Sequence, residues 1–402
     1  MTAWLRRVVE HGRMLLAMPK AMVPCVRGSS VFQTDQLPEL KKLITEQAAR
    51  DKALLDQRLD EVRAIGPVRI IKPRSATSVA LMAADGGNNR VAFNPFYLQV
   101  IRVVDSHGKE LFMDVVSPTS DVRELSKRHL DNSGAHTPLG RLMLDLGVSD
   151  LHQLSPMMTS ESTGWVLTYR DLCEWATLYE LICSRRFAQD TLLVHDGLLR
   201  CKLFRGELFI KMYELIKGNI DRVYAEDRRR IWLVGLAKQT EVLEHYRLAI
   251  SLSRIFERGS PCFVAVPEKM QERVYRWAEY TRRPDDTSTK EKPKFNMGAM
   301  HFVRFGSRSG DPVWTVDLLD CQKADAQAVF GYLLTDAVAG FPVPFYPNCL
   351  QQADNHSRVA DLDLDIVEDN LIDAIRCQVG PDLAPIIDEL RIATDVAARR
   401  YE

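Results

Sequence analysis

Two apolar runs that each lead into Asp-Gly constrain the fold of this chain most strongly. Residues 79–83 are followed by Ala84-Asp85-Gly86-Gly87, and residues 191–194 are followed by His195-Asp196-Gly197. Short apolar runs next to glycine are typical of buried strands that end in a sharp turn. We therefore expect Asp85 and Asp196 at the ends of neighbouring strands, where carboxylates form an oxygen-rich site for Mn²⁺ or Mg²⁺. An ordinary strand-to-turn junction has the same pattern.

The composition limits the class of protein. The 402 residues are 46% hydrophobic and 27% charged, and the formal net charge is −1. This is a globular composition without an overall basic field, so any contact with nucleic acid must come from local clusters. No uncharged apolar run is long enough to span a membrane, and the eight cysteines form no C-x-x-C pair. We expect a cytoplasmic protein with reduced cysteines.

The chain divides into an N-terminal arm and one larger domain. Residues 1–70 form a helical arm, because residues 36–64 place leucines at helical spacing between charged side chains. We expect this arm to serve in packing or self-association. Residues 71–402 form the main domain, with helical insertions near 117–165 and 203–230.

The order of apolar runs in the main domain predicts an α/β fold. Strands at 79–83, 96–104 and 111–116 form an antiparallel meander, with His107-Gly108 as the last turn. Further strands are expected at 192–194, 231–236, 300–305 and 313–318, and helices at 169–186, 206–228, 240–256, 324–337 and from 350 onward. Three antiparallel strands followed by a helix and a further strand are typical of an RNase H-like mixed sheet flanked by helices.

Such a sheet needs a third acid on the helix between the first and fourth strands. Glu174 and Glu180 are the two candidates. We favour Glu174 because it shares a helical face with Leu178 and Leu181, and a carboxylate among apolar neighbours is costly unless it is paired or binds a metal. Either glutamate would also fit a solvated helix edge.

Further candidate site residues come later in the chain. Lys238 follows the run at 231–236 and is placed to steady a phosphate, although a lysine at a strand end is often simply exposed. Asp354 or His356 would complete the metal shell or orient a water molecule. Asp354 would equally fit a helix cap.

Local basic clusters are candidates for phosphate binding. They comprise Arg228, Arg229 and Arg230, then Arg282 and Arg283, and the lysines at 290, 292 and 294. The nearby aromatic residues Tyr275, Trp277, Tyr280 and Phe302 would stack on bases. The alternatives are solvated charged faces and core packing.

Five motifs in this order resemble the NurA nuclease family over roughly residues 79–360. The two Asp-Gly turns and the helix segment Tyr169-Arg170-Asp171-Leu172-Cys173-Glu174 match three of them. The strand end Val234-Gly235-Leu236-Ala237-Lys238 matches the fourth, and residues 340–345 before Leu350-Gln351-Gln352-Ala353-Asp354 match the fifth. Gly87 and Leu198 replace the serines of the family turns, and Asp354 stands where the family has histidine.

The resemblance implies an RNase H-like, Mn²⁺- or Mg²⁺-dependent DNase that acts on single-stranded DNA and DNA ends. It implies a homodimer that works with a HerA-type hexameric ATPase in DNA end processing and repair. Asp85, Glu174, Asp196 and Asp354 would be the metal ligands, and Lys238 and His356 further catalytic residues. Two alternatives stay open: a non-catalytic scaffold for an ATPase ring, and an antiphage nuclease that acts on DNA or RNA.

Overall fold

The computed structural model describes residues 37–75, 79–93, 95–159, 164–256, 259–275, 278–281, 294–358, 361–380, 382–383 and 385–387. The contacts divide the chain into two compact units, residues 1–57 and residues 58–402. The domain boundary that we place at residue 70 stays a prediction.

The expected N-terminal helix is present as α2 (Leu37–Arg63). In the larger unit its last turn is part of a hydrophobic core. Val62 is fully buried and lies in one cluster with residues of α8 (Glu241–Ser253) and β9 (Cys262–Ala265). The Tyr246 hydroxyl also donates a hydrogen bond to Glu61, at 2.6 Å. The C-terminal end of α2 is therefore anchored to the α8 side of the sheet.

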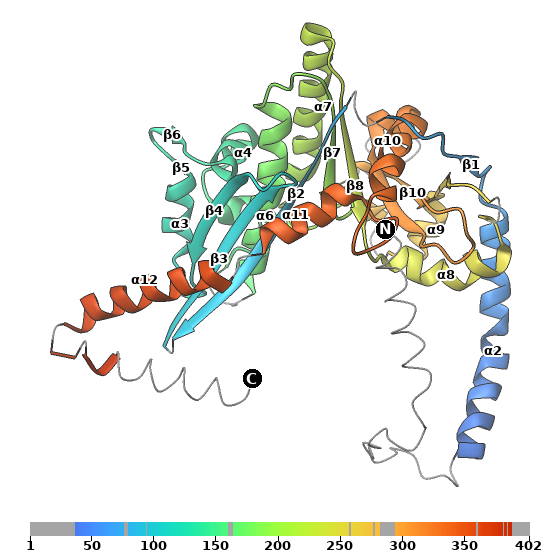
Figure 1. Cartoon of the computed structure of the whole chain (residues 1–402), viewed down its shortest axis with the longest axis horizontal. Coiled ribbons are helices and arrows are strands. Elements are labelled where there is room, and N and C mark those ends of the chain that lie inside the picture. Colours follow the sequence, from blue (N-terminus) through green and yellow to red (C-terminus); the bar gives the residue numbers. More distant parts are fainter. Residues whose placement is uncertain are drawn as a thin grey trace, which may run out of the picture. The chain divides into compact units, whose positions relative to one another are not determined.

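The larger unit is built on one nine-stranded mixed sheet (Figure 1). Its strand order is β1-β9-β10-β11-β8-β7-β2-β3-β4. The centre and one side comprise β2 (Val79–Phe93), β3 (Phe96–Asp105), β4 (Glu110–Val116), β7 (Asp190–Asp196) and β8 (Ile231–Ala237). The other side comprises β11 (Trp314–Leu319), β10 (Gly298–Arg304), β9 and the two-residue β1 (Arg69–Ile70).

The central strands have the predicted RNase H-like arrangement. The strands β2, β3 and β4 form an antiparallel meander, whereas β7 pairs parallel to β2, and β8 pairs parallel to β7. Helix α6 (Trp165–Cys183) connects the meander to β7, and α7 (Leu208–Asp227) connects β7 to β8. The predicted fold class, an α/β protein with an RNase H-like mixed sheet, is therefore confirmed. The turn at Gly108, where φ is 77°, also lies where we expected it.

The predicted turn after residue 84 is wrong, because β2 continues through it. Asp85, Gly86 and Gly87 pair with Val104, Val103 and Arg102 of β3, and the strand ends only at Phe93. Neither glycine has a positive φ. These glycines thus serve close packing on the two faces of the sheet, as the site geometry shows below. The turn after Asp196 is real, since Gly197 has φ 146°.

Helices cover both faces of the sheet. On one face α6 packs on β2, β3 and β4, and α4 (Pro138–Leu146) and α7 pack against α6. On the other face α11 (Asn348–Ser357) packs on β2, β3 and β7, and α10 (Ala326–Val338) contributes to the same core. Short elements that we did not predict are α3 (Val122–His129), β5 (Leu130–Asp131), β6 (Gly134–Ala135), α5 (Leu151–Leu154), α9 (Glu268–Glu272), η2 (Ala278–Tyr280), η3 (Asp320–Asp325) and the strands β1 and β9.

The helical region predicted from residue 350 onward contains two helices, α11 and α12. After α11, helix α12 (Asp361–Val379) packs through Leu371, Ile372 and Ile375 against Val91, in the extension of β2 beyond the predicted turn. The long β2 therefore gives α12 its docking surface.

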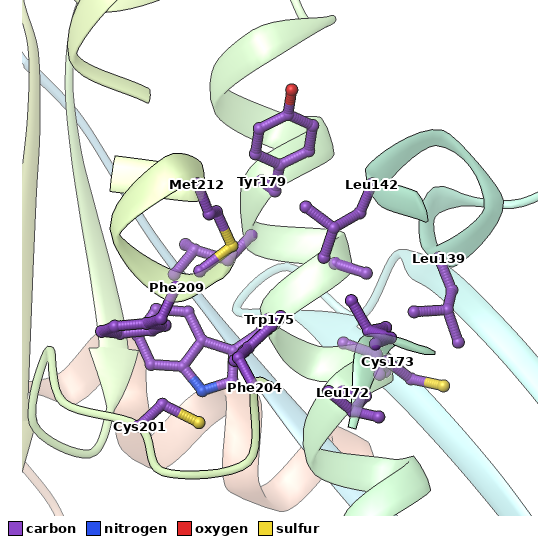
Figure 2. Close-up of a cluster of buried hydrophobic side chains, with 14 of the residues drawn as sticks. Leu139, Leu142, Leu172, Cys173, Trp175, Tyr179, Cys201, Phe204, Phe209 and Met212 are labelled. Atoms are coloured by element: carbon purple, nitrogen blue, oxygen red, sulfur yellow. The ribbon is translucent and has the colours of Figure 1, made fainter. Parts of the chain in front are cut away.

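Trp175 links the core under α6 to the end of β7. Figure 2 shows its indole beside the ring of Phe209 from α7, within a core cluster to which α4 and α6 also contribute. The ring of Phe209 meets it edge-on at 5.2 Å between centroids, and the His195 ring lies 4.5 Å away on the β7 side. A rigid apolar core thus supports the residue that precedes Asp196.

None of the helices in the described ranges is long and apolar enough to cross a membrane. No disulfide bond joins the seven cysteines that fall in those ranges.

Candidate functional site

Four carboxylates from four different elements line one cavity of about 430 Å³. They are Asp85 of β2, Glu174 of α6, Asp196 of β7 and Asp354 of α11. The remaining lining residues are Gly86, Gly87, Asn88, Asn89, Arg170, Ser357 and Arg358. The structure therefore brings together the four acids that we predicted as metal ligands.

Asp85 approaches the cavity from the α11 face of the sheet. The Ser357 hydroxyl donates a hydrogen bond to Asp85 Oδ2 at 2.8 Å. Burial, together with repulsion from Asp196 and Asp354, raises the pKa of the Asp85 carboxyl, although Ser357 partly opposes this shift. A side chain at Gly87 would overlap the carbonyl oxygen of Ser357. The absence of that side chain is what lets α11 approach β2.

Glu174 approaches from the opposite face, because successive residues of a strand alternate between faces. A Cβ atom at Gly86 would lie 3.2 Å from Glu174 Oε2 and 3.6 Å from the Cγ atom of Arg170. The missing side chain at Gly86 thus leaves room for the carboxylate beside β2. The Gly-Gly pair is thus explained: Gly86 leaves room for side chains of α6, and Gly87 leaves room for the backbone of α11.

Glu174 and His195 form a buried pair. Glu174 is 9% exposed and His195 is 7% exposed, and His195 Nδ1 lies 3.3 Å from Glu174 Oε1. Burial raises the pKa of the Glu174 carboxyl. Burial alone would lower the pKa of His195, but the adjacent Glu174 carboxylate and the nearby Asp196 reverse this, so the pKa of His195 is raised. The contact is not aligned as a hydrogen bond, so Glu174 Oε1 has no hydrogen-bond partner among the described residues.

Asp196 is held from two sides. The Tyr346 hydroxyl donates to Oδ1 and the Lys238 ammonium donates to Oδ2, both at 3.0 Å. Burial, with the adjacent Asp196 carboxylate, raises the pKa of Tyr346, so the phenol stays protonated and acts as a donor. Lys238 also lies 3.8 Å from Asp354 Oδ1, and its pKa is raised because these carboxylates outweigh its own desolvation. Arg358 pairs with Asp354 Oδ2 at 3.0 Å.

The carboxylate oxygens of the cavity are ligands of the kind that a hard divalent cation prefers, but they are not grouped as a metal-binding set. Clustered carboxylate oxygens are ligands that Mg²⁺ and Mn²⁺ prefer. The acceptor atom of Glu174 without a hydrogen-bond partner and the mutual repulsion of Asp85, Asp196 and Asp354 are what a cation would relieve. In the described ranges, however, no three His, Cys, Asp or Glu side chains are grouped closely enough to hold a metal ion. Lys238 and Arg358 instead pair with two of the acids.

Other predicted residues lie away from this cavity. The His356 ring lies next to Gly108 in the β3–β4 turn, with Nδ1 3.4 Å from the position of a Cβ atom there. Asp354 itself lines the cavity, but it is the seventh residue of α11, which begins at Asn348, so the helix-cap interpretation is wrong. Arg228, Arg229 and Arg230 precede β8, at the opposite end of that strand from Lys238. Phe302 is fully buried, which fits the alternative of core packing and not base stacking. The candidates Arg282, Arg283 and Trp277 lie outside the described residues.

Sequence reasoning missed four polar residues of the site as functional candidates. They are Arg170, Tyr346, Ser357 and Arg358. Arg170 is one helical turn before Glu174, so the helical spacing held a signal for it. Arg358 lies four residues after Asp354, with which it pairs, so the same spacing held a signal for it. Tyr346 and Ser357 had no local signal. Tyr346 and Ser357 contact acids that are 150 and 272 residues away in the sequence.

The strand order and the carboxylate cavity together define an RNase H-like α/β protein with an acidic site at the end of its central parallel strands. No protein-family model matches the chain, and no curated protein matches it. Solved structures of NurA do match over most of the chain. A crystal structure of the NurA nuclease from Sulfolobus solfataricus covers 87% of this chain and 99% of its own, at 13% identity and a TM-score of 0.38.

Two further solved structures are similar over much of the chain. A structure of NurA bound to dAMP and manganese covers 82% of this chain and 94% of its own, at 10% identity and a TM-score of 0.36. A Marinitoga piezophila Argonaute in complex with guide RNA and target DNA covers 72% of this chain and 31% of its own, at 9% identity and a TM-score of 0.24.

Proposed function

We propose that this protein is a metal-dependent deoxyribonuclease that cleaves single-stranded DNA and DNA ends. One observation carries the proposal: Asp85, Glu174, Asp196 and Asp354 converge from four elements on one cavity at the end of an RNase H-like sheet. Buried acids that repel one another are stable only when something positive compensates them, and this arrangement is common at functional sites. The motifs shared with NurA nucleases support the same activity.

The residues of the cavity have separable roles in this proposal. Asp85, Glu174, Asp196 and Asp354 would hold Mn²⁺ or Mg²⁺, which supplies Lewis-acid activation of the phosphodiester and of water when bound. Ser357 and Tyr346 orient Asp85 and Asp196 through hydrogen bonds. His195 positions Glu174 from the buried side. Lys238 would move from its carboxylate partners to a phosphate oxygen and stabilise the charge that develops there.

We further propose that the protein acts as a homodimer with a HerA-type hexameric ATPase in DNA end processing. The sequence motifs are the basis for this partnership.

The test is cleavage of matched DNA, RNA and DNA–RNA hybrid oligonucleotides of one sequence, with Mn²⁺ and then with excess EDTA. We expect cleavage of the single-stranded DNA, its loss in EDTA and its return with Mn²⁺. Full cleavage in EDTA would contradict the metal requirement. Preference for RNA or the hybrid would instead favour the alternative of a nuclease with another substrate, including an antiphage effector.

One observation favours a second candidate, the non-catalytic scaffold. Lys238 and Arg358 pair with Asp196 and Asp354, so these two acids already have positive partners within the protein. The double variant Asp85→Asn, Asp196→Asn separates the two. A scaffold would keep its cellular activity in that variant, whereas a nuclease would lose it.

A further inference from the structure

A second cleft lies next to the acidic cavity and has the opposite charge. Its volume is about 620 Å³, and it lies between α8 and the β10–β11 hairpin. Four of its charged lining residues are cations, namely Lys238, Arg247, Arg254 and Arg304, and one, Asp311, is an acid. The carboxylate of Asp311 already accepts a hydrogen bond from the backbone N–H of Arg308 at 2.7 Å. In a chain with a net charge of −1, this is a local concentration of positive charge.

The cleft and the acidic cavity share a wall. Lys238 lines the cleft and donates to Asp196, which lines the cavity. The Trp314 ring, also in the cleft, packs edge-on against Tyr346 at 4.9 Å, and the Tyr346 hydroxyl donates to Asp196. A molecule in the cleft would therefore meet Lys238 at the boundary with the acids.

Arg304 adds a buried cation to the cleft wall. It is 2% exposed, and its guanidinium donates to the carbonyl oxygens of Phe256 and Ser260. Its Nε atom has no hydrogen-bond partner among the described residues. Arg247 and Arg254 lie on and directly after α8, at the rim. Buried and rim cations together suit a ligand that carries several negative charges in a row.

The apolar part of the lining suits the same kind of ligand. Leu243, Ile250, Pro312, Val313 and Trp314 lie between the cations. A nucleic-acid strand offers both surfaces, because its phosphates alternate with sugars and bases that pack on apolar and aromatic groups.

We propose that this cleft binds the sugar–phosphate backbone of a single nucleic-acid strand, which passes Lys238 to reach the acidic cavity. The inference rests on the proposed nuclease function and adds the path of the substrate. It assigns the path to α8 and the β10–β11 hairpin, and not to Arg228, Arg229 and Arg230 at the far end of β8.

The test is equilibrium binding of a fluorescent single-stranded oligonucleotide, in EDTA to prevent cleavage, over a range of salt concentrations. The test variant is Arg247→Gln with Arg254→Asn. Asparagine is chosen because residue 254 has φ 56°, a region that asparagine tolerates. Each phosphate contact to a single strand contributes about 0.7 to the slope of log K against log salt. Losing two contacts should therefore reduce the slope by about 1.4 and weaken binding.

The matched control is Arg123→Gln with Lys127→Gln on α3. Lys127 pairs with Glu124 at 2.6 Å at spacing i, i+3, as Arg247 pairs with Glu244 at 2.6 Å. The control removes the same charge and an ion pair comparable to Arg247–Glu244, and we expect the wild-type slope. Thermal unfolding of both variants verifies that each is folded.

An unchanged slope in the test variant, or an equal fall in the control, would overturn the proposed path. A fall only when Arg228 and Arg229 are replaced would move the path to the other end of β8. If the wild type cleaves DNA and the test variant binds normally, the path is wrong and the nuclease function stands. If the wild type neither binds nor cleaves, both fail.

Discussion

The close approach of Glu174 to the backbone of β2 can be tested by replacing Gly86 with alanine. The new Cβ atom would lie 3.2 Å from Glu174 Oε2, slightly inside ordinary van der Waals contact. The carboxylate must then retreat by a few tenths of an ångström. Because a misplacement of about 1 Å costs roughly a hundredfold in rate, we expect a loss of up to about tenfold, or about 1.4 kcal/mol of activation free energy.

The stability of Gly86→Ala should change little. Alanine in a strand interior is about 0.5–1 kcal/mol more favourable than glycine, which offsets the strain of the tight contact. The assay is the rate of Mn²⁺-dependent cleavage of single-stranded DNA, with thermal unfolding of the same samples. Gly87→Ala should behave differently, because its Cβ atom would overlap the backbone of Ser357, which cannot rotate away. That variant should lose stability as well as activity.

Gly218→Ala in α7 is the matched control, since nothing lies within 4 Å of its new Cβ atom. It should gain up to about 1 kcal/mol of stability and keep the wild-type rate. A Gly86→Ala variant that is folded and cleaves at the wild-type rate would refute the role that we assign to this glycine and to the position of Glu174.

The other predictions concern the helical acid, a buried histidine and the N-terminal arm. Glu174→Gln should abolish cleavage and Glu180→Gln should not; the reverse result would move the ligand to Glu180. Burial lowers the pKa of His129 from 6.5 to about 4, so the folded state favours the neutral imidazole. The folded state therefore keeps its full stability above about pH 6.5 and loses stability as the pH falls toward 4. Between about pH 7 and pH 5, the free energy of unfolding measured with urea should thus fall by about 2 kcal/mol less in His129→Gln than in the wild type. An equal fall in both proteins would contradict this. A chain that lacks residues 1–57 should be monomeric by light scattering, because α2 exposes Leu43, Ile44 and Leu54; a persistent dimer would exclude this arm as the interface.

Apolar runs were enough to predict most of the sheet. Strands β3, β4, β7, β8, β10 and β11 lie where alternating or continuous apolar residues indicated them. The strands β1 and β9, at one side of the sheet, were missed for a physical reason. β1 has two residues and pairs with β9, so tertiary pairing and not local pattern determines it. Antiparallel pairing with β10 likewise fixes the four-residue β9.

The acids were predicted more readily than their partners. Asp85 was identified from a turn that does not exist. The glycines after it allow close packing on both faces of β2, and the chain does not reverse there. Glu174 was identified from its helical face, a local property. Ser357 and Tyr346 contact these acids only because α11 and the segment before it fold back onto the sheet. A single sequence carries no local pattern for such contacts.

The most direct test of the account is degradation of end-labelled single-stranded DNA in Mn²⁺ by the wild type and Asp85→Asn in parallel. Replacing Asp85 leaves the pairs Glu174–His195, Asp196–Lys238 and Asp354–Arg358 in place. The account predicts metal-dependent cleavage by the wild type and its loss in the variant. Equal cleavage by both proteins, or none by the wild type, would contradict a nuclease site built on these four carboxylates.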